Sequence, residues 1–254
     1  MVTNKKDQIR ALLKSIETGD PDAVAVVNES KYVQHNPHTL EGSEGLAELF
    51  KRISETSPSV RVVRAFEDGD FVFAHTEYDF ADRNIGFEVF RFEEGQAVEH
   101  WDNIQPRLGP NPSGHTMTDG PTEATHVDRT ETNRSLVRSF VNEVLIGARV
   151  DEIETYVDRC GYTEHNPDMA DGFESLLSAL GGAATKTPAS RYQTLHRVLA
   201  DGDFVLSMCE GVMGDSSWAF YDLFRVDDGK VVEHWDTSGA IPPRSEWNNN
   251  NGKF

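Results

Sequence analysis

Acidic and imidazole side chains recur at matched places in the two halves of this 254-residue sequence. Glu-His-Trp-Asp stands at 99–102 and again at 233–236, and His-Asn-Pro stands at 35–37 and again at 165–167. A histidine that pairs with a carboxylate is oriented and made more basic, which suits it to carry protons near neutral pH. A second carboxylate in an apolar pocket can have a raised pKa and remove a proton next to a carbonyl group. These residue types favour acid–base chemistry, provided that the fold brings them together.

The recurrence extends over a whole domain. Tyr-x-x-His-Asn-Pro returns after 130 residues, Asp-Gly-Asp-Phe after 133, and the segment 87–102 after 134. Three matches in one order and at nearly constant spacing indicate a duplicated domain of about 110 residues. Polar residues recur as faithfully as apolar ones, which indicates a shared site as well as a shared core.

The sequence predicts four segments. The first copy occupies 1–105 and the second 131–243. Between them, 106–130 is rich in Pro, Gly, Ser and Thr without periodicity, which is typical of a linker. The end of the chain, 244–254, contains four consecutive asparagines and is expected to be a disordered tail.

Composition limits the partners. A formal charge of −19 and a pI near 4.8 argue against nucleic acid and against anionic membrane surfaces. No apolar run approaches the roughly 20 residues that a membrane span needs. The first residues lack the apolar stretch of an export signal. The two cysteines, Cys160 and Cys209, match neither a disulfide framework nor a zinc site. We therefore expect a cytoplasmic protein with a small-molecule ligand.

Each copy should place helices before strands. Apolar residues at helical spacing in 9–16 predict one helix, and Asp20-Pro21 predicts the start of a second, which runs toward Tyr32. A third helix is expected at 43–53. Helices that cover one face of a curved, mainly antiparallel sheet make an α+β domain with a pocket between sheet and helices. The predicted strands of the first copy are 60–66, 71–78, 85–92 and 97–104.

The turns between strands predict which side chains face each other. Glu93-Glu94-Gly95 is typical of a three-residue loop with glycine in the left-handed conformation. That register sets Glu88 opposite His100, with Asp102 on the same side of the sheet. By the same count the second copy repeats the arrangement with Asp222, His234 and Asp236.

A candidate site follows if this face lines the pocket. The second helix would end in Tyr32-x-x-His35-Asn36, which puts Tyr32 and His35 on one helical face. Alternation along 71–77 puts Phe73 and His75 on one face of their strand. The expected catalytic residues are Asp102, His100, Glu88, His75 and His35. The expected ligand-binding residues are Tyr32, Asn36, Phe73, Phe90, His165, Asn166, Asp222, His234 and Asp236.

Structural roles could account for several of these residues instead. Glu–His pairs across strands also occur as surface decoration, and His35-Asn36 could serve only to end a helix. Trp101 and Trp235 fall on the opposite face and are expected to be packing residues, on a surface where the two copies could meet. Histidines and carboxylates can also hold a metal ion. No spacing here is diagnostic of a metal site, and none is predicted.

At the His-Asn-Pro turn and at Phe-x-x-x-x-Gly-x-x-x-Glu-His-Trp-Asp, the chain resembles the SnoaL-like polyketide cyclases. These belong to the nuclear-transport-factor-2-like superfamily of cone-shaped α+β barrels. The resemblance covers nearly all of 1–105 and 131–243 and implies two such barrels. It implies intramolecular aldol closure without metal or cofactor, with Asp102 and Asp236 acting on the enolisable carbon beside His100 and His234. Members of this family commonly form dimers that pack sheet to sheet. The resemblance therefore implies that the two copies in this chain pair with each other.

Two functions remain open after this comparison. One is an aldol cyclase or isomerase that transfers protons on a small carbonyl compound, with Asp102 as the base. The other is a non-catalytic module of the same fold that binds or senses a small molecule. The second copy has Met208 in place of His75 and Glu164 in place of Gln34, so it is expected to be a degenerate partner or to bind a different ligand. Further association of chains is left open.

Overall fold

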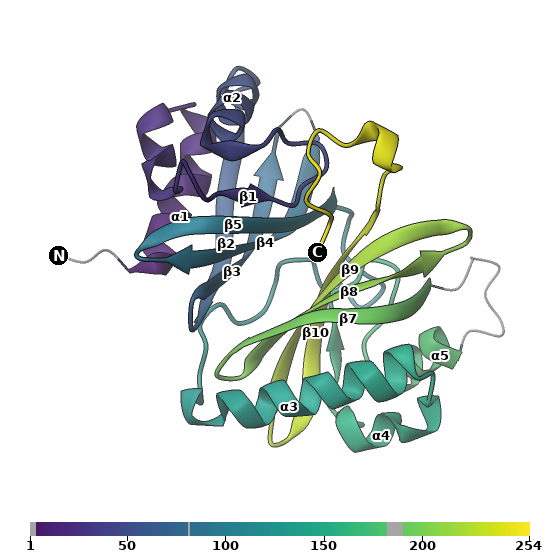
Figure 1. Cartoon of the computed structure of the whole chain (residues 1–254). Helices are drawn as coiled ribbons and strands as arrows, with labels where there is room; N and C mark the ends of the chain where they lie inside the picture. Colours follow the sequence, from purple (N-terminus) through teal and green to yellow (C-terminus); the bar gives the residue numbers. More distant parts are fainter. Residues whose placement is uncertain (1–3, 81, 182–189) are drawn as a thin grey trace. The chain divides into compact units, whose positions relative to one another are not determined.

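The computed structural model describes residues 4–80, 82–181 and 190–254, which form two compact units (Figure 1). One unit comprises the residues up to Arg107 together with Pro242–Phe254. The other comprises Leu108–Ile241. Each unit carries one five-stranded sheet and its helices, so the predicted duplication and α+β class are confirmed. Among the described residues, no helix has the length and apolar character that crossing a bilayer would require.

The two sheets have the same topology. The first has the order β1-β5-β4-β3-β2, and the second has the order β6-β10-β9-β8-β7. In each, the short first strand runs parallel to the last strand, and the other neighbours are antiparallel. The first unit contains α1 (Lys5–Lys14), β1 (Val33–Gln34), α2 (Gly42–Ser54), β2 (Ser59–Asp68), β3 (Phe71–Asp79), β4 (Arg83–Glu93) and β5 (Gln96–Pro106). The second contains α3 (Thr130–Phe140), α4 (Ile153–Tyr156), β6 (Thr163–Glu164), α5 (Phe173–Gly181), β7 (Ser190–Asp201), β8 (Phe204–Met213), β9 (Ser216–Asp227) and β10 (Lys230–Ala240).

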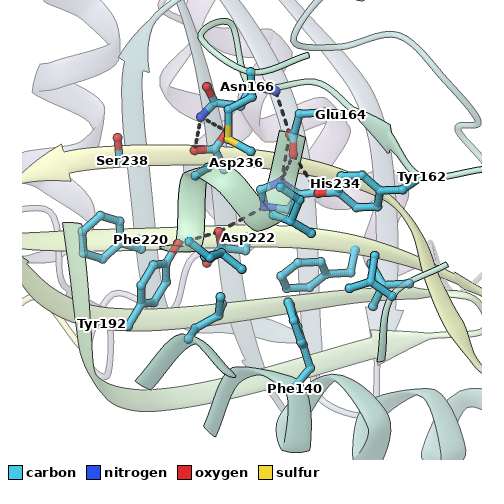
Figure 2. A pocket seen from close by; sticks show the side chains of 18 of the residues that line it. Phe140, Tyr162, Glu164, Asn166, Tyr192, Phe220, Asp222, His234, Asp236 and Ser238 are labelled. Atoms are coloured by element: carbon cyan, nitrogen blue, oxygen red, sulfur yellow. Dashed lines mark hydrogen bonds and ion pairs between the residues drawn. The ribbon is translucent and has the colours of Figure 1, made fainter. Parts of the chain in front are cut away.

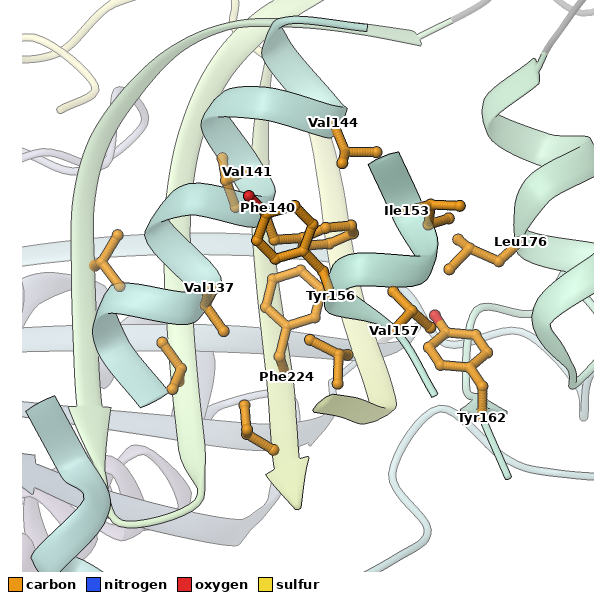
Figure 3. Close-up of a cluster of buried hydrophobic side chains, with 14 of the residues drawn as sticks. Val137, Phe140, Val141, Val144, Ile153, Tyr156, Val157, Tyr162, Leu176 and Phe224 are labelled. Atoms are coloured by element: carbon orange, nitrogen blue, oxygen red, sulfur yellow. The ribbon is translucent and has the colours of Figure 1, made fainter. Parts of the chain in front are cut away.

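The first helix of each unit covers one face of its sheet through an apolar stripe. In α1, Asn4 caps the N-terminus by accepting the Lys6 N–H, and Ile9, Leu12 and Leu13 are buried. The stripe of α3 continues into a π-helical turn at Val141–Ile146. Phe140, the last residue of α3, meets the ring of Phe224 edge-on at a centroid distance of 5.6 Å (Figure 3). This packing fixes the distance between helix and sheet, and so the depth of the pocket beside it.

The predicted second helix of the first copy is wrong. Asp20 caps only a six-residue 3-10 helix, Pro21–Val26, and the chain then becomes extended. The β-branched residues Val24, Val26 and Val27 favour this because they lose side-chain freedom in a helix. β1 follows and pairs with β5, where Gln34 lies opposite His100. Alternate residues around β1 therefore point to opposite sides of the sheet, which changes which of them can reach the pocket.

The predicted hairpin register is also wrong by two residues. The turns have two residues, not three: Glu94 and Gly95 have φ of 52° and 84°, and Glu93 pairs with Gln96. A two-residue turn with both φ positive matches the twist of the strands. A bulge follows Arg91, and Glu88 therefore lies opposite Asp102, while His100 lies opposite Phe90. A shift by two keeps every side chain on its predicted face. The second copy has the same change, with Asp222 opposite Asp236.

Glycine at the turn between β7 and β8 is required for two reasons. Gly202 has φ of +60°, and a Cβ there would lie 2.0 Å from the Thr125 carbonyl oxygen. Its counterpart Gly69 has φ of +57° but nothing within 4 Å of such a Cβ. We expect Gly69→Ala to cost about 1–2 kcal/mol for the left-handed backbone alone. Gly202→Ala should cost clearly more, since the Thr125 segment must also move. Calorimetric unfolding of both variants checks this, and equal losses would contradict it.

Candidate functional site

Each unit encloses a cavity between the helix-covered face of its sheet and the helices. The first has a volume of about 170 Å³ and the second about 240 Å³. Apolar side chains from the helices and polar side chains from the last two strands line both. Glu88, His100 and Asp102 line the first cavity, and Asp222, His234 and Asp236 line the second. The structure therefore brings these six residues to the pockets in two matched sets.

In the first pocket a hydrogen-bonded chain crosses the sheet. His100 Nε2 lies 2.7 Å from Glu88 Oε2, and His100 Nδ1 lies 2.9 Å from Gln34 Oε1. The Tyr78 hydroxyl donates to Glu88 Oε1 at 2.5 Å. Gln34 Oε1 also accepts the Asn36 N–H, so this oxygen is fixed as an acceptor and His100 Nδ1 must carry a proton.

The end of the chain contacts the first unit beside this pocket. The expectation of a disordered tail is wrong for 247–253, because asparagine amides there bond to backbone carbonyls of the first unit. Asn249 Nδ2 donates to the carbonyl oxygens of Asn36 and Thr39, and Asn251 Nδ2 donates to that of Gln34. The tail ends with Lys253, whose ammonium group donates to the Asp102 carbonyl oxygen at 2.5 Å and lies 3.2 Å from Asp102 Oδ1.

This lysine decides the ionisation of Asp102. Burial alone would raise the pKa of Asp102. The charge of Lys253, the His100 imidazole and a 2.5 Å hydrogen bond from Asn36 Nδ2 outweigh burial and lower it below its usual value. Glu88 has no such cation beside it, and burial raises its pKa even though His100 opposes the change. Asp102 is therefore an ionised carboxylate at neutral pH, engaged by both an amide and an ammonium group.

Several predicted residues lie elsewhere. His35 lies on the opposite face, stacked on Trp101 at 4.8 Å, with its ring nitrogens bonded to Glu99 and to the Gly252 carbonyl oxygen. It is excluded from the pocket because β1 is a strand, so Gln34 and Asn36 face inward and His35 does not. His165 repeats this arrangement on Trp235, at 4.6 Å. The placement of both histidines in the pocket is wrong.

His75 and Phe73 are also outside the pocket. His75 lies opposite Phe87 and stacks on it at 4.4 Å, on the other side of the sheet from Glu88. The face predicted for this strand was therefore reversed, and Tyr78 reaches the pocket in place of His75. Tyr32 is buried in the apolar core, within 3.3 Å of Gln34 Nε2. Phe90 and Asn36 do line the cavity, and Phe90 stacks on His100 at 4.3 Å.

The second pocket has a different charge arrangement (Figure 2). Glu164 replaces Gln34, and its Oε1 lies 2.9 Å from His234 Nδ1. On the other side of the ring, His234 Nε2 lies 3.2 Å from Asp222 Oδ1. Burial opposes a charge on His234, but the two carboxylates outweigh it and raise the pKa of His234 well above its usual value. The imidazole is therefore cationic and donates to both carboxylates.

Asp236 faces the second cavity without a strong cationic partner. Burial raises its pKa, and although the imidazolium of His234 opposes this, the carboxylates of Glu164 and Asp222 add to it, so that the pKa reaches about 7. Asn166 Nδ2 donates to both oxygens of Asp236, at 3.0 and 2.9 Å. A carboxyl group that is half protonated at neutral pH and lines a cavity can both accept and return a proton.

Several pocket residues were missed from the sequence, among them Gln34, Glu164, Tyr78 and Tyr192. Gln34 and Glu164 had a visible signal, since Tyr32, Gln34 and Asn36 alternate as a strand requires. Tyr78 had the same signal in its own strand. Tyr192 of β7 had none: its ring stacks on Phe220 at 4.5 Å, and its hydroxyl donates to Asp222 Oδ1 at 2.9 Å. Its hydroxyl group bonds Asp222 as the Tyr78 hydroxyl group bonds Glu88 in the first pocket, but Tyr192 lies on β7, whereas Tyr78 lies on β3.

The first pocket contains ligand types that a metal ion could use. Glu88, His100 and Asp102 each offer one atom, and these atoms lie within 4.8 Å of one another. All three residues already have partners in Lys253, Gln34 or one another. A metal ion would have to displace the ammonium group of Lys253.

Removing the charge of Glu164 should lower the pKa of His234. Glu164 gives the largest favourable contribution to that imidazolium, so Glu164→Gln should reduce the pKa by at least about 1 unit. Titration of the imidazole resonances by NMR measures this. Asp168→Asn, which changes a pocket carboxylate that makes no bond to His234, is the control. An unchanged His234 pKa in Glu164→Gln would refute the arrangement.

The comparisons with known proteins each match less than half of the chain. Residues 9–100 match the model of the SnoaL-like domain. No curated protein matches the chain. Among solved structures, a proposed ketosteroid isomerase of Kribbella flavida is 21% identical, with a TM-score of 0.39, over 45% of this chain and 84% of its own. TsrD of Streptomyces laurentii is 20% identical, with a TM-score of 0.35, over 41% and 92%. An NTF2-like protein of unknown function from Cytophaga hutchinsonii is 17% identical, with a TM-score of 0.36, over 41% and 91%.

Proposed function

Since residues 9–100 form a SnoaL-like domain that the chain repeats in a second unit, we propose that the protein is an acid–base enzyme acting on a small, largely apolar carbonyl compound. Its reaction is of the isomerase or aldol-cyclase type, and it takes place in the second pocket. The observation that carries the proposal is the placement of Asp236, a buried carboxyl group that lines a cavity of about 240 Å³ and is held by Asn166, where burial raises its pKa to about 7. Asp236 replaces Asp102 as the expected base, because Lys253 engages Asp102.

The proposed step moves one proton. Asp236 takes the proton from the carbon next to the carbonyl group, and the electron pair of that C–H bond becomes the enolate. The imidazolium of His234, held between Glu164 and Asp222, supplies a fixed positive charge near the developing anion. Asp236 then returns its proton to carbon at another position, or the enolate carbon attacks a second carbonyl group and closes a ring, and Asp236 returns its proton to the alkoxide oxygen that forms. Protons and charge balance within enzyme and substrate.

The residues around Asp236 support this role. Asn166 fixes both carboxyl oxygens, so the acid presents one orientation to the cavity. The Tyr192 hydroxyl and the His234 imidazole hold Asp222, so Asp222 serves as a fixed charge and Asp236 as the mobile proton carrier. The walls are mainly apolar, with Phe140, Phe220 and Phe224 among them. Apolar walls keep the carboxylate poorly solvated and therefore basic.

Deuterium exchange tests the proposal without knowledge of the natural substrate. The purified chain is incubated in D₂O at pH 7.5 with small aryl and alkyl ketones, and loss of the α-proton signal is followed by NMR. Exchange faster than buffer and faster than heat-unfolded protein supports the proposal. Exchange at the buffer rate for a ketone that titration shows to be bound would refute it, and it would favour the alternative of a binding module.

Ligand binding without turnover is favoured for the first pocket by one observation. Lys253 is bonded to Asp102, and this lowers the pKa of the carboxyl group that would otherwise carry the proton. We infer that the first unit contributes binding or stability and the second contributes the chemistry. The duplication would then have divided two roles between two copies of one fold.

A further inference from the structure

Asp102 of the first pocket binds an ammonium group from the end of the chain. The side chain of Lys253 is 10% exposed, and its ammonium group bonds both the backbone and the carboxylate of Asp102. It reaches a residue 151 positions earlier in the chain. The contact is a primary ammonium group bound at a buried carboxylate beside a cavity.

The second pocket has a carboxylate at the matching position of its sheet. Asp236 matches Asp102 in its position at the end of the last strand, two residues after the pocket histidine. Each lies opposite the carboxylate of the neighbouring strand, Glu88 or Asp222. Each accepts hydrogen bonds from the side-chain amide of the His-Asn-Pro turn. Among the described residues, the two sites differ in the ammonium group that binds Asp102 and in Glu164, which stands where the first pocket has Gln34.

The two cavities also differ in the charge of the residues that line them. Glu164, Asp168, Asp222 and Asp236 line the second cavity, against one cationic group, His234. No lysine or arginine is among the described residues that line it, and Asp236 has no ion pair with one in the described part of the chain. The first cavity, in contrast, has Arg52 in its lining and Lys253 on Asp102. A cleft lined by one sign of charge concentrates ligands of the opposite sign.

We propose that the second pocket takes a cationic ligand, a small molecule with an apolar body and a protonated amine. Its ammonium group binds Asp236 as Lys253 binds Asp102. The apolar body lies against the aromatic and aliphatic walls, which include Phe140, Phe220 and Leu180. Ligands whose only charge is a carboxylate are rejected by the four acidic side chains.

This inference rests on the proposed function where it names the substrate, which becomes a carbonyl compound that carries an amine. An ammonium group beside Asp236 favours the ionised carboxylate, as Lys253 does for Asp102. One carboxylate oxygen can pair with the ammonium group while the other takes the carbon-bound proton.

The binding part is tested with three probes of one shape: 2-phenylethylamine, 2-phenylethanol and phenylacetate. Calorimetric titration at pH 7.5 should give tighter binding of the amine than of the alcohol, by about 10-fold or more, and weaker binding of phenylacetate than of either. Asp236→Asn should reduce amine affinity to that of the alcohol, and Ser238→Ala, an uncharged change in the same pocket, should leave the preference in place. Equal affinity for the three probes would overturn the proposal.

A second variant tests the correspondence between Asp102 and Asp236 without changing Asp236. Lys253→Ala frees Asp102, so the amine should bind with a stoichiometry of two, and Lys253→Ala with Asp102→Asn should return it to one. An unchanged stoichiometry in Lys253→Ala would contradict the assignment of this position as an ammonium subsite. Amine selectivity without deuterium exchange would refute only the proposed function. Exchange of neutral ketones without amine selectivity would refute only this inference.

Discussion

Asp236→Asn is expected to reduce the rate of α-proton exchange by at least about 100-fold, because a positioned general base contributes about 10²–10⁴-fold. An asparagine keeps the size of the side chain and can still accept a hydrogen bond from Asn166, but it cannot take a proton. The loss should appear in kcat, with a smaller change in KM, since the proton transfer itself is affected.

The matched control is Glu210→Gln. It removes a carboxylate from the same unit, but Glu210 lies on β8 at the surface, paired with His196, and its side chain is 40% exposed. This variant should keep the wild-type rate. Should Asp102→Asn lose the activity while Asp236→Asn retains it, the chemistry belongs to the first pocket.

The same assignment predicts the pH dependence of the rate. Asp236 acts as a base only when ionised, and its pKa is about 7. The exchange rate should therefore rise with pH through about 7 and level off above it. His234 stays charged through this range, because its pKa is raised well above its usual value. A profile that is flat from pH 5 to 8 would show that another group takes the proton.

Asp236→Asn is also expected to stabilise the second unit at high pH. The pKa of Asp236 rises from 3.8 to about 7 on folding, so between these values the folded chain holds a proton that the unfolded chain has released. This contribution is fully present below pH 4 and is lost as the pH rises through 7. Each pKa unit corresponds to about 1.4 kcal/mol, so the contribution is a few kcal/mol.

Urea unfolding at several pH values measures this effect. The asparagine introduced by Asp236→Asn is neutral at every pH, so variant and wild type should have similar stability near pH 4. The variant should become more stable by a few kcal/mol near pH 8, where the wild type must bury a carboxylate. Glu210→Gln should show no such divergence. A constant difference across the range would mean that the environment does not perturb Asp236.

The sequence was sufficient for the duplication, the fold class and the pocket carboxylates Glu88, Asp102, Asp222 and Asp236. Periodicity predicted α1 and the four long strands of the first copy, because apolar alternation follows directly from burial. The hairpin register was wrong by two residues, yet Glu88, His100 and Asp102 kept their face, since only an odd shift moves a side chain to the other side. On β3 the face itself was reversed, which exchanged His75 for Tyr78.

Other features were beyond sequence reasoning for physical reasons. The segment before β1 had helix signals at its start, but pairing of Val33 and Gln34 with β5 decided its conformation. Lys253 stands in a polar tail without periodicity, and its partner Asp102 is distant in sequence. The different ionisation of Asp102 and Asp236 depends on that contact and on burial, and neither has a local signature.

A carbon-13 NMR titration of the aspartate carboxyl groups tests the central claim most directly. Asp236→Asn and Asp102→Asn assign the two resonances. The structure predicts that Asp236 titrates near 7 and that Asp102 titrates below its usual value of 3.8. Titration of both groups together near 4 would contradict it.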